Sequence, residues 1–576
     1  MAERAEQGLK KGLTSYGDTG FSLFLRKAFI KGMGYSDDAL DRPIVGIIDT
    51  ASGFNACHAN VPDLVEAVKR GVMLAGALPV PFPTISVHES FSHPTSMFLR
   101  NLMAIDTEEM IRAQPMDAVV MIGGCDKTVP AQLMGAISAD IPAIQLVTGP
   151  MLTGRHRSER VGACTDCRRF WGRHRAGEID EAEIAEVNDR LVPGAGTCGV
   201  MGTASTMALV TEAMGMMAPG GATPPAVSAD RRRVAETTGG LAVRLAAEGR
   251  KPSEIVTRDS IENALVVLLA TGGSTNAIVH LAAIAGRAGL KLDLDAFDAI
   301  GRRVPVLVDL KPSGSNYMED LHAAGGLLTI LRELTGHLHL DCMTVTGRTL
   351  GQEIEAGPAG WRQEIVAPLA KPIYPEGGIA VVRGNLAPGG AIVKQSAATA
   401  NLLTHRGRAI VFSSIADMAA RVDDPDLDVR AEDILVLQNA GPKGAPGMPE
   451  AGYMPIPKKL GAAGVKDMVR ISDARMSGTA SGTIVLHVTP ESADGGPLAL
   501  VRTGDIIELD VPGRRLHLDV SNEELEERRK SFVAPDHQGS DRGYKKLFLD
   551  TVLQADEGCD FSFLLPARTG VVPGSE

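Results

Sequence analysis

The chain has 576 residues, more than the roughly 250–300 residues at which single hydrophobic cores stop growing, so about two or three domains are expected. Hydrophobic residues form 44% of it, the fraction of an ordinary globular protein. The formal net charge of -12 excludes a general electrostatic attraction to nucleic acid or to an anionic membrane, so we expect neither as a partner. An anionic substrate would need local cations.

The sequence contains no run of about 18 apolar residues that could cross a membrane, and its charged N-terminus lacks the apolar segment of a signal peptide. We therefore expect a cytoplasmic protein. Seven cysteines are a low and odd count for this length. This count argues against a secreted disulfide framework and favours thiols that are reduced, buried or bound to metal.

The first part of the chain has the pattern of an α/β fold. Apolar runs at residues 43–50, 117–124 and 142–149 predict strands, with helical patterns between them. One helix is expected to begin at Asn60, a cap-like residue followed by an early proline. The strands are expected to be mostly parallel, and ligands gather beyond the carboxyl ends of such strands. Cys125 comes directly after the second of these strands.

Helical patterns dominate residues 253–286 and are interrupted by Thr-Gly-Gly-Ser-Thr-Asn at 271–276, a break that leads into a new helix. Backbone amides and hydroxyls there could face a ligand, or the break is an ordinary helix-start turn. Three prolines within residues 366–375 suit an extended linker. We therefore predict two domains, residues 1–370 with an α/β fold and residues 371–576 with mainly β structure.

The second domain is predicted from short apolar runs that are typical of strands. A hairpin is expected around Pro-Gly-Arg at 512–514, and the whole domain is expected to resemble a barrel. The predicted strands are residues 378–382, 409–412, 434–438, 483–488, 506–511 and 516–520.

Three cysteines lie in loops rich in glycine or polar residues: Cys57, Cys125 and Cys198. Thiolates brought together from distant loops would suit an iron–sulfur cluster. The alternative is that each thiol is a buried small hydrophobe, as single free cysteines often are. Cys164 and Cys167 form a C-x-x-C pair without a second such pair, so we expect a packing role for them.

Glu89, Asp126 and Glu450 form a second, oxygen-rich constellation, and hard carboxylates suit Mg²⁺. Each of these acids alone is more often solvated or salt-bridged, and Lys127 is most simply the salt-bridge partner of Asp126 or Glu89. A loop of small residues at 472–482 contains serines, and a serine there can be activated where neighbouring cations lower its pKa. The alternative is a plain serine–glycine turn.

Together these segments resemble the family of dihydroxy-acid, phosphogluconate and aldonate dehydratases. Cys-Arg-Arg-Phe-Trp at 167–171 and the tail at 552–561 are similar to the sugar-acid branch, which includes L-arabinonate and D-xylonate dehydratases. The stretches that match the family are Gly-Cys-Asp-Lys-Thr at 124–128, Thr-Cys-Gly-Val-Met-Gly-Thr-Ala at 197–204, Gly-Gly-Ser-Thr-Asn at 272–276, Gly-Pro-Lys-Gly-Ala-Pro-Gly-Met-Pro-Glu at 441–450 and the serine loop at 472–482.

The resemblance implies a hydro-lyase that dehydrates a 2,3-dihydroxy sugar acid to the 2-keto-3-deoxy acid. It implies that Ser477 is the base for the C2 proton, that Thr479 contacts the substrate, and that an iron–sulfur cluster and Mg²⁺ act as Lewis acids. The cluster is 2Fe-2S in similar members and 4Fe-4S in others. Lys127 would be carbamylated, which requires its pKa to be depressed. The ligands implied are Cys57, Cys125 and Cys198 for the cluster and Glu89, Asp126, Lys127 and Glu450 for Mg²⁺.

The serine loop departs from many relatives, which leaves the shape of the substrate open. Ala474 and Met476 stand where those relatives have glycine and phenylalanine, and their second glycine after the serine is missing. The main rival function is the same chemistry on the branched-chain dihydroxy acids of amino-acid biosynthesis. A rival from another class is an iron–sulfur electron carrier or sensor, which would have no need of Mg²⁺. The resemblance also implies a homodimer or homotetramer.

Overall fold

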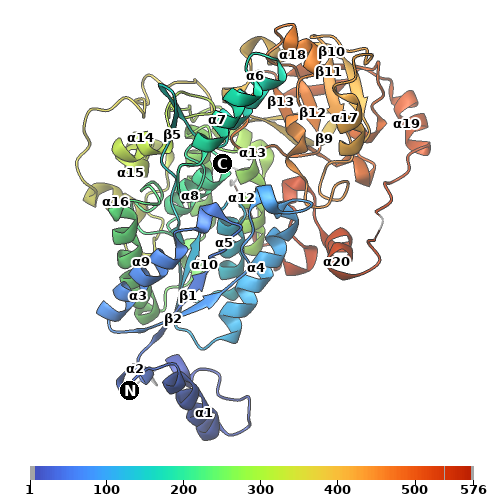
Figure 1. Ribbon diagram of the computed structural model, residues 1–576. Coiled ribbons are helices and arrows are strands. Elements are labelled where there is room, and N and C mark those ends of the chain that lie inside the picture. The colour runs from blue at the N-terminus through green and yellow to red at the C-terminus, as the bar shows by residue number, and fades with distance from the viewer. Residues whose placement is uncertain (1–6, 538, 573–576) are drawn as a thin grey trace.

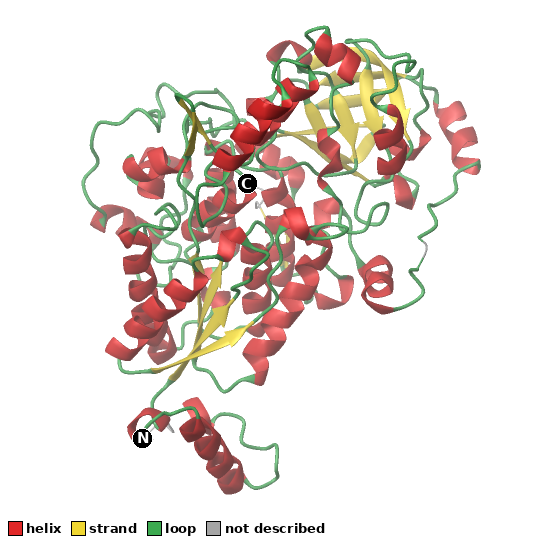
Figure 2. Ribbon diagram, viewed as in Figure 1, coloured by secondary structure: helices red, strands yellow, loops and turns green. Residues whose placement is uncertain are grey.

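The structure is a computed structural model that describes residues 7–537 and 539–572. It contains a helix-rich α/β body and a closed barrel of strands, which lie side by side (Figure 1). Figure 2 shows the open sheet among the helices of the first body and the barrel in the second. The predicted combination of a parallel-sheet α/β fold with a mainly β, barrel-like fold is confirmed.

The open sheet has parallel strands in the order β2-β1-β3-β4. The strands predicted near residues 43, 117 and 142 are confirmed as β1, β3 and β4. β2 was not predicted, because three of its six residues are prolines, which are tolerated at the edge of a sheet and not at its centre. The bounds are Ile44–Asp49 for β1, Leu78–Pro83 for β2, Ala118–Gly123 for β3 and Ala143–Val147 for β4.

Helices cover both faces of this sheet (Figure 1). α3 (Val61–Leu74) and α9 (Ala229–Glu248) pack together on one face, and α4 (Ser96–Ala113) and α5 (Thr128–Ala139) pack on the other. The apolar side chains of the strands are therefore buried on both sides, which explains their nearly continuous hydrophobic runs.

α3 begins where it was predicted, but Asn60 does not cap it through its side chain. Its amide instead donates to the carbonyl oxygens of Thr148 at 2.9 Å and Ala226 at 3.0 Å. Asn60 therefore ties the start of α3 to the loop that follows β4, and the expectation of a capping role was wrong.

Further helices of the α/β body pack against α5 on the side away from the sheet, with α8 (Thr203–Ala213) and α12 (Asn276–Arg287) in contact with α5 and α11 (Arg258–Ala270) in contact with α8. α8 is buried along its whole length, and the predicted break at residues 271–276 separates α11 from α12. Among the described helices, none combines the length and the apolarity that crossing a bilayer requires. The other α-helices are α1 (Thr19–Gly32), α2 (Asp37–Leu40), α6 (Thr165–Arg175), α7 (Glu181–Leu191), α10 (Pro252–Ile255), α13 (Leu294–Gly301), α14 (Met318–Ala323), α15 (Gly326–Glu333), α16 (Leu350–Ala356), α17 (Ile415–Arg421), α18 (Lys458–Ala462), α19 (Asn522–Lys530) and α20 (Gly543–Thr551).

The barrel closes in the order β10-β11-β12-β13-β9-β8-β15-β14 and has its own apolar core. The predicted hairpin is the antiparallel pair of β14 and β15. β9 and β12 were not predicted, because β9 begins with Ala-Pro-Gly-Gly and β12 has only three residues. The bounds are β8 Ala380–Gly384, β9 Ala387–Val393, β10 Thr404–Phe412, β11 Ile434–Leu437, β12 Arg470–Ser472, β13 Ile484–Thr489, β14 Ile506–Asp510 and β15 Arg515–Leu518.

The chain crosses between the two bodies more than once. The proline-rich segment at 366–375 lies against the α/β body, where Val366 and Tyr374 form β-bridges to Val308 and Val306. After the barrel the chain returns, and β16 (Gly570–Val572) pairs with β7 (Leu290–Leu292) of the α/β body. A second small ladder joins β5 (Gly154–His156) to β6 (Glu159–Val161). The domain boundary at residue 370 stays a prediction.

A buried ion pair fastens the returning segment. Arg287 of α12 donates two hydrogen bonds to Asp560, at 2.5 and 3.1 Å, and both side chains are fully buried. Arg287 also pairs with Glu108 of α4 at 3.3 Å. The two-bond geometry with a carboxylate makes this a strong, directional contact.

Replacement of Asp560 by alanine should lower the free energy of unfolding by about 3 kcal/mol, since it leaves a buried charge with only one of its two partners. The measurement is the unfolding midpoint in urea followed by circular dichroism. Arg568→Ala is the control, because Arg568 pairs with Glu557 at the surface, where an ion pair contributes about 0–1 kcal/mol. Equal effects of the two changes would contradict the anchoring role of Asp560.

Candidate active site

The loops that follow β1, β2 and β3 meet the serine loop of the barrel. Arg475, just before Ser477, reaches across to the loop after β2, where it contacts Glu89 and Thr95. Parallel strands bring their carboxyl ends to one edge, so these loops collect there. They carry Cys57 after β1, His88 and Glu89 after β2, and Cys125, Asp126 and Lys127 after β3.

His58 holds two of these loops together. Its Nε2 accepts hydrogen bonds from the backbone N–H groups of Gly124 and Cys125, both at 3.0 Å, and its Nδ1 lies 3.0 Å from the Thr50 carbonyl oxygen. Burial lowers the pKa of His58 to about 4, so the ring is neutral and Nδ1 carries the proton. Gly124 has no room for a side chain, since a Cβ atom would lie 1.7 Å from the Thr148 hydroxyl oxygen.

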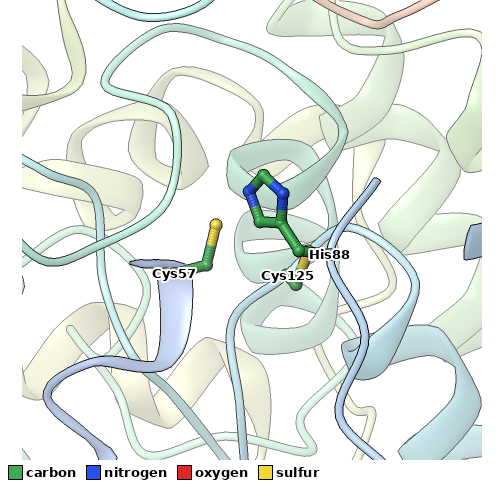
Figure 3. Close-up of side chains that lie close together, drawn as sticks. All are labelled: Cys57, His88 and Cys125. Carbon is green, nitrogen blue, oxygen red and sulfur yellow. The ribbon is translucent and has the colours of Figure 1, made fainter. Parts of the chain in front are cut away.

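Cys57 and Cys125 come together, and His88 lies with them (Figure 3). The two sulfurs and an imidazole nitrogen lie within 4.8 Å of one another. A hydrogen bond with Cys125, together with burial, raises the pKa of the Cys57 thiol, and the contact with Cys57 raises the pKa of His88. A metal bound here would displace the thiol protons. The sequence signal for His88 was its place directly before Glu89, one of the candidate carboxylates.

Cys198 lies on a neighbouring loop, outside this group of three. The backbone N–H of Gly196 donates to the Ala56 carbonyl at 3.2 Å, so the loops of Cys57 and Cys198 touch. The Cys198 sulfur lies 3.3 Å from that of Cys164, a residue for which only packing was expected. Cys198 therefore has a thiol neighbour that sequence reasoning missed, and its place as an iron ligand stays a prediction.

Carboxylate oxygens of Glu89, Asp126 and Glu450 lie within 4.8 Å of one another. Lys127 is fully buried and pairs with Asp126 and, at 3.5 Å, with Glu89. Arg475 donates to Glu450 at 2.7 Å and to Glu89 at 3.1 Å. Two buried cations therefore hold three acids that come from both bodies of the protein.

The two cations set the charge of this group. Burial opposes ionisation of Glu89, but Arg475 and Lys127 outweigh it and hold the Glu89 pKa well below its usual range. Burial and Arg475 act to lower the pKa of Lys127, but Asp126, Glu89 and Glu450 raise it above its ordinary value. The depressed lysine pKa expected for carbamylation is thus not found, because the acids stabilise the ammonium form.

The donor chemistry of the two groups fits two kinds of metal. Sulfur and imidazole suit iron, whereas carboxylate oxygens suit Mg²⁺. Neighbouring residues supply both sets, since His88 precedes Glu89 and Cys125 precedes Asp126. The Cys125 sulfur lies 3.6 Å from an Asp126 carboxylate oxygen. A small ligand with adjacent oxygen atoms could therefore contact both groups at once.

Ser477 lies in the loop between β12 and β13, and its hydroxyl is 2.8 Å from that of Thr479. Thr165 of α6 donates to the Thr479 carbonyl at 3.0 Å and fixes the far side of this turn. Gly478, between the two hydroxyl residues, packs against Ser274, where a Cβ atom would lie 2.4 Å from the Ser274 hydroxyl oxygen. The helix break at 271–276 therefore lies beside the serine loop.

The departures of the serine loop from many relatives lie in the core. Ala474 and Met476 have no exposed surface. Met476 packs with Ala480, Ile484 and Leu486 in an apolar cluster of the barrel. These changes therefore alter the packing beneath the loop.

Both halves of the chain match one protein family. Residues 42–353 match dihydroxy-acid/6-phosphogluconate dehydratase N-terminal, and residues 364–559 match dihydroxy-acid/6-phosphogluconate dehydratase C-terminal. The two matches cover the open sheet, the barrel and every candidate site residue.

Several relatives are similar over nearly the whole chain. L-arabinonate dehydratase of Rhizobium leguminosarum bv. trifolii is 47% identical over 97% of this chain and 96% of its own length. L-arabonate dehydratase of Azospirillum brasilense is 47% identical over 96% of both chains. 6-Deoxy-6-sulfo-D-gluconate dehydratase of Pseudomonas putida is 45% identical over 92% of this chain and 91% of its own. Relatives named dihydroxy-acid dehydratase also match, at 38–40% identity.

Replacement of Arg475 by methionine should lower the free energy of unfolding by about 3–5 kcal/mol, because it removes the buried cation that Glu89 and Glu450 share. The measurement is thermal unfolding followed by circular dichroism. Arg168→Met is the matched control: Arg168 is partly exposed and lies 3.8 Å from Glu450, so its loss should change stability by less than about 1 kcal/mol. Similar losses in both variants would show that Arg475 has no special place in the site.

Proposed function

The chain belongs to the dihydroxy-acid/6-phosphogluconate dehydratase family, and we propose that it removes water from a five-carbon sugar acid such as L-arabinonate or D-xylonate. A member of this family is a dehydratase, a hydro-lyase, which sets aside the electron carrier or sensor without turnover. The observation that carries the proposal is the contact between a sulfur–nitrogen donor group and a carboxylate group, next to a serine loop. The product is the 2-keto-3-deoxy acid.

Two observations favour a sugar acid over a branched-chain dihydroxy acid. Relatives named for sugar acids are 45–47% identical to this chain, against 38–40% for those named dihydroxy-acid dehydratase. Arg168 also lies beside the carboxylate group, with a guanidinium nitrogen 3.8 Å from Glu450 and its side chain 30% exposed. Hydroxyls of a sugar acid can accept from such an exposed N–H group, whereas a branched alkyl chain cannot.

Ser477 is the base in this proposal. Its Oγ, as alkoxide, takes the C2 proton while the bond from C3 to its hydroxyl breaks, and the resulting enol tautomerises to the keto acid. The Thr479 hydroxyl, 2.8 Å away, can orient the serine oxygen or contact the substrate. The proton held on Ser477 and the departing hydroxide together make the water that is released.

The metals in this proposal are an iron–sulfur cluster, of the 2Fe-2S type, and Mg²⁺. When bound, they supply Lewis acidity for the departing hydroxide and for the charge that develops on the substrate oxygens. Lys127 could join the Mg²⁺ ligands only as a carbamate, which its raised pKa opposes while the acids stabilise the ammonium. The ligands assigned are Cys57, Cys125 and Cys198 for the cluster, and Glu89, Asp126, Glu450 and carbamylated Lys127 for Mg²⁺.

We also propose a cytoplasmic homodimer or homotetramer. Helix α1 projects from the α/β body (Figure 1). Phe24, Phe29 and Met33, on and just after α1, are 66%, 75% and 76% exposed. Large apolar side chains gathered on one projecting segment are typical of a surface that is covered in an assembly.

A panel of acids tests the substrate. Purified protein is given L-arabinonate, D-xylonate, D-gluconate and 2,3-dihydroxyisovalerate, and release of 2-keto acid is measured. We expect kcat/KM for the best five-carbon sugar acid to exceed that for 2,3-dihydroxyisovalerate by at least about 100-fold, since the branched substrate leaves polar groups unpaired. A preference for 2,3-dihydroxyisovalerate would make the branched-chain acid the substrate.

Ser477→Ala should lower kcat by about 100- to 10,000-fold, the range for loss of a general base, while the visible absorbance of the cluster is unchanged. Thr479→Ala is the comparison, and its effect should be larger on KM than on kcat. The measurements are steady-state kinetics on L-arabinonate and an absorbance spectrum of each variant. A Ser477→Ala variant that turns over at the wild-type rate would remove the serine from the base role.

A further inference from the structure

Lys394 is a buried cation that touches the serine loop. It follows β9 directly, only 1% of it is exposed, and its Nζ donates to the carbonyl oxygen of Gly478 at 3.4 Å. Gly478 is the residue after Ser477. In the described part of the chain, no carboxylate lies within salt-bridge distance of Lys394, which is unusual for a buried lysine.

The charged groups on the segments around Lys394 are engaged elsewhere. Asp467 pairs with Arg470 at 2.6 Å, and Glu376 pairs with Arg514 at 2.7 Å. The other charged or titratable groups on the barrel segments near this end are Asp473, which accepts from the backbone of Ala440 and Ser492, Arg475, which pairs with Glu89 and Glu450, and the buried His487 of β13.

Apart from Lys394, the residues found in contact with the turn of Ser477 are uncharged, and Arg475, two residues before the serine, is paired with Glu89 and Glu450. Thr479 contacts the serine hydroxyl, and Gly478 packs against Ser274 and the backbone of Thr203. Among the described residues, Lys394 is therefore the cation whose side chain hydrogen-bonds to this turn. A buried ammonium without an anion lowers stability, and burial alone lowers the pKa of Lys394 to about 7. A group that weakens the fold and contacts the residue after the proposed base indicates a functional reason for its presence.

We propose that Lys394 is a positioning residue that fixes the turn of Ser477 through the Gly478 carbonyl and places a positive charge beside the serine, so that its alkoxide forms at lower pH. This inference rests on the proposed role of Ser477 as the base. The lysine does not touch the substrate; it acts through the serine loop. The negative charge of the serine alkoxide offsets the positive charge of the Lys394 ammonium. The buried ammonium therefore gains an anionic partner when Ser477 loses its proton.

The activity test compares Lys394→Met, Lys394→Arg and Lys459→Met, with keto-acid release from L-arabinonate as the assay. Lys459 is the matched control, because it too donates to backbone carbonyls of the barrel, those of Pro425 and Leu427. We expect Lys394→Met to lower kcat at least about 100-fold with KM changed less than about threefold, and to move the acidic limb of the kcat profile up by at least about one pH unit. Lys394→Arg should restore most of the rate, and Lys459→Met should match the wild type.

Two results would overturn the proposal. One is a Lys394→Met enzyme with the wild-type kcat and pH profile. The other is a loss of kcat that leaves the pH profile in place and that arginine does not restore, which would mean a packing role. Wild-type protein that converts no acid of the panel would instead refute the proposed function, so the two failures are distinguishable.

A stability measurement decides the charge of Lys394 without any turnover. The unfolded lysine keeps its proton up to about pH 10.4, whereas the buried lysine loses it near pH 7, so the folded wild type gains stability between these values. Lys394→Met lacks this dependence. We expect it to melt at a higher temperature than the wild type at pH 7, with the difference shrinking by pH 10. A lower melting temperature at pH 7 would show that Lys394 stabilises the fold and would contradict the proposal.

Discussion

The site depends on the hydrogen bonds that the buried guanidinium of Arg475 donates to two carboxylates. Arg475 bonds to Glu89, which the sheet supplies, and to Glu450, which the barrel supplies. Without a cation at this point, carboxylates from the two bodies would repel each other in a buried place, and breaking such a group is strongly destabilising. Because Arg475 stands two residues before Ser477, the contact that joins the bodies also fixes the start of the serine loop over the sheet edge.

The loops beyond the carboxyl ends of the sheet strands also explain why sulfur or nitrogen donors alternate with carboxylates along the chain. His88 and Glu89 are neighbours in one loop, and Cys125 and Asp126 are neighbours in another, so each loop contributes one residue to the sulfur–nitrogen group and one to the carboxylate group. The two groups must therefore lie side by side. His58 fixes the loop after β3 relative to the loop after β1, because its neutral ring accepts from the backbone of Gly124 and Cys125 and faces the carbonyl of Thr50.

Local features of the site could be predicted from the sequence, and partnerships across the fold could not. Cys125 follows an apolar strand without a spacer, so its place beyond a strand end was readable from periodicity alone. Arg475 binds Glu89, 386 positions away, and Cys198 lies against Cys164 in a loop whose path no local pattern indicates. Lys394 was missed for a related reason. β9 begins with Ala-Pro-Gly-Gly and was not predicted as a strand, so no local pattern indicated that the lysine directly after it is buried.

The charge balance of the site bears on the proposed acid substrate. Around the carboxylates of Glu89, Asp126 and Glu450 lie three cations: Lys127, Arg475 and, 3.8 Å from Glu450, the partly exposed Arg168. Carbamylation of Lys127 would remove one of these cations and add a negative charge. The proposed anionic substrate would then be repelled unless a divalent cation lay among the carboxylates. With a carbamylated Lys127, the Mg²⁺ of the proposed function would therefore be needed for substrate binding as well as for catalysis.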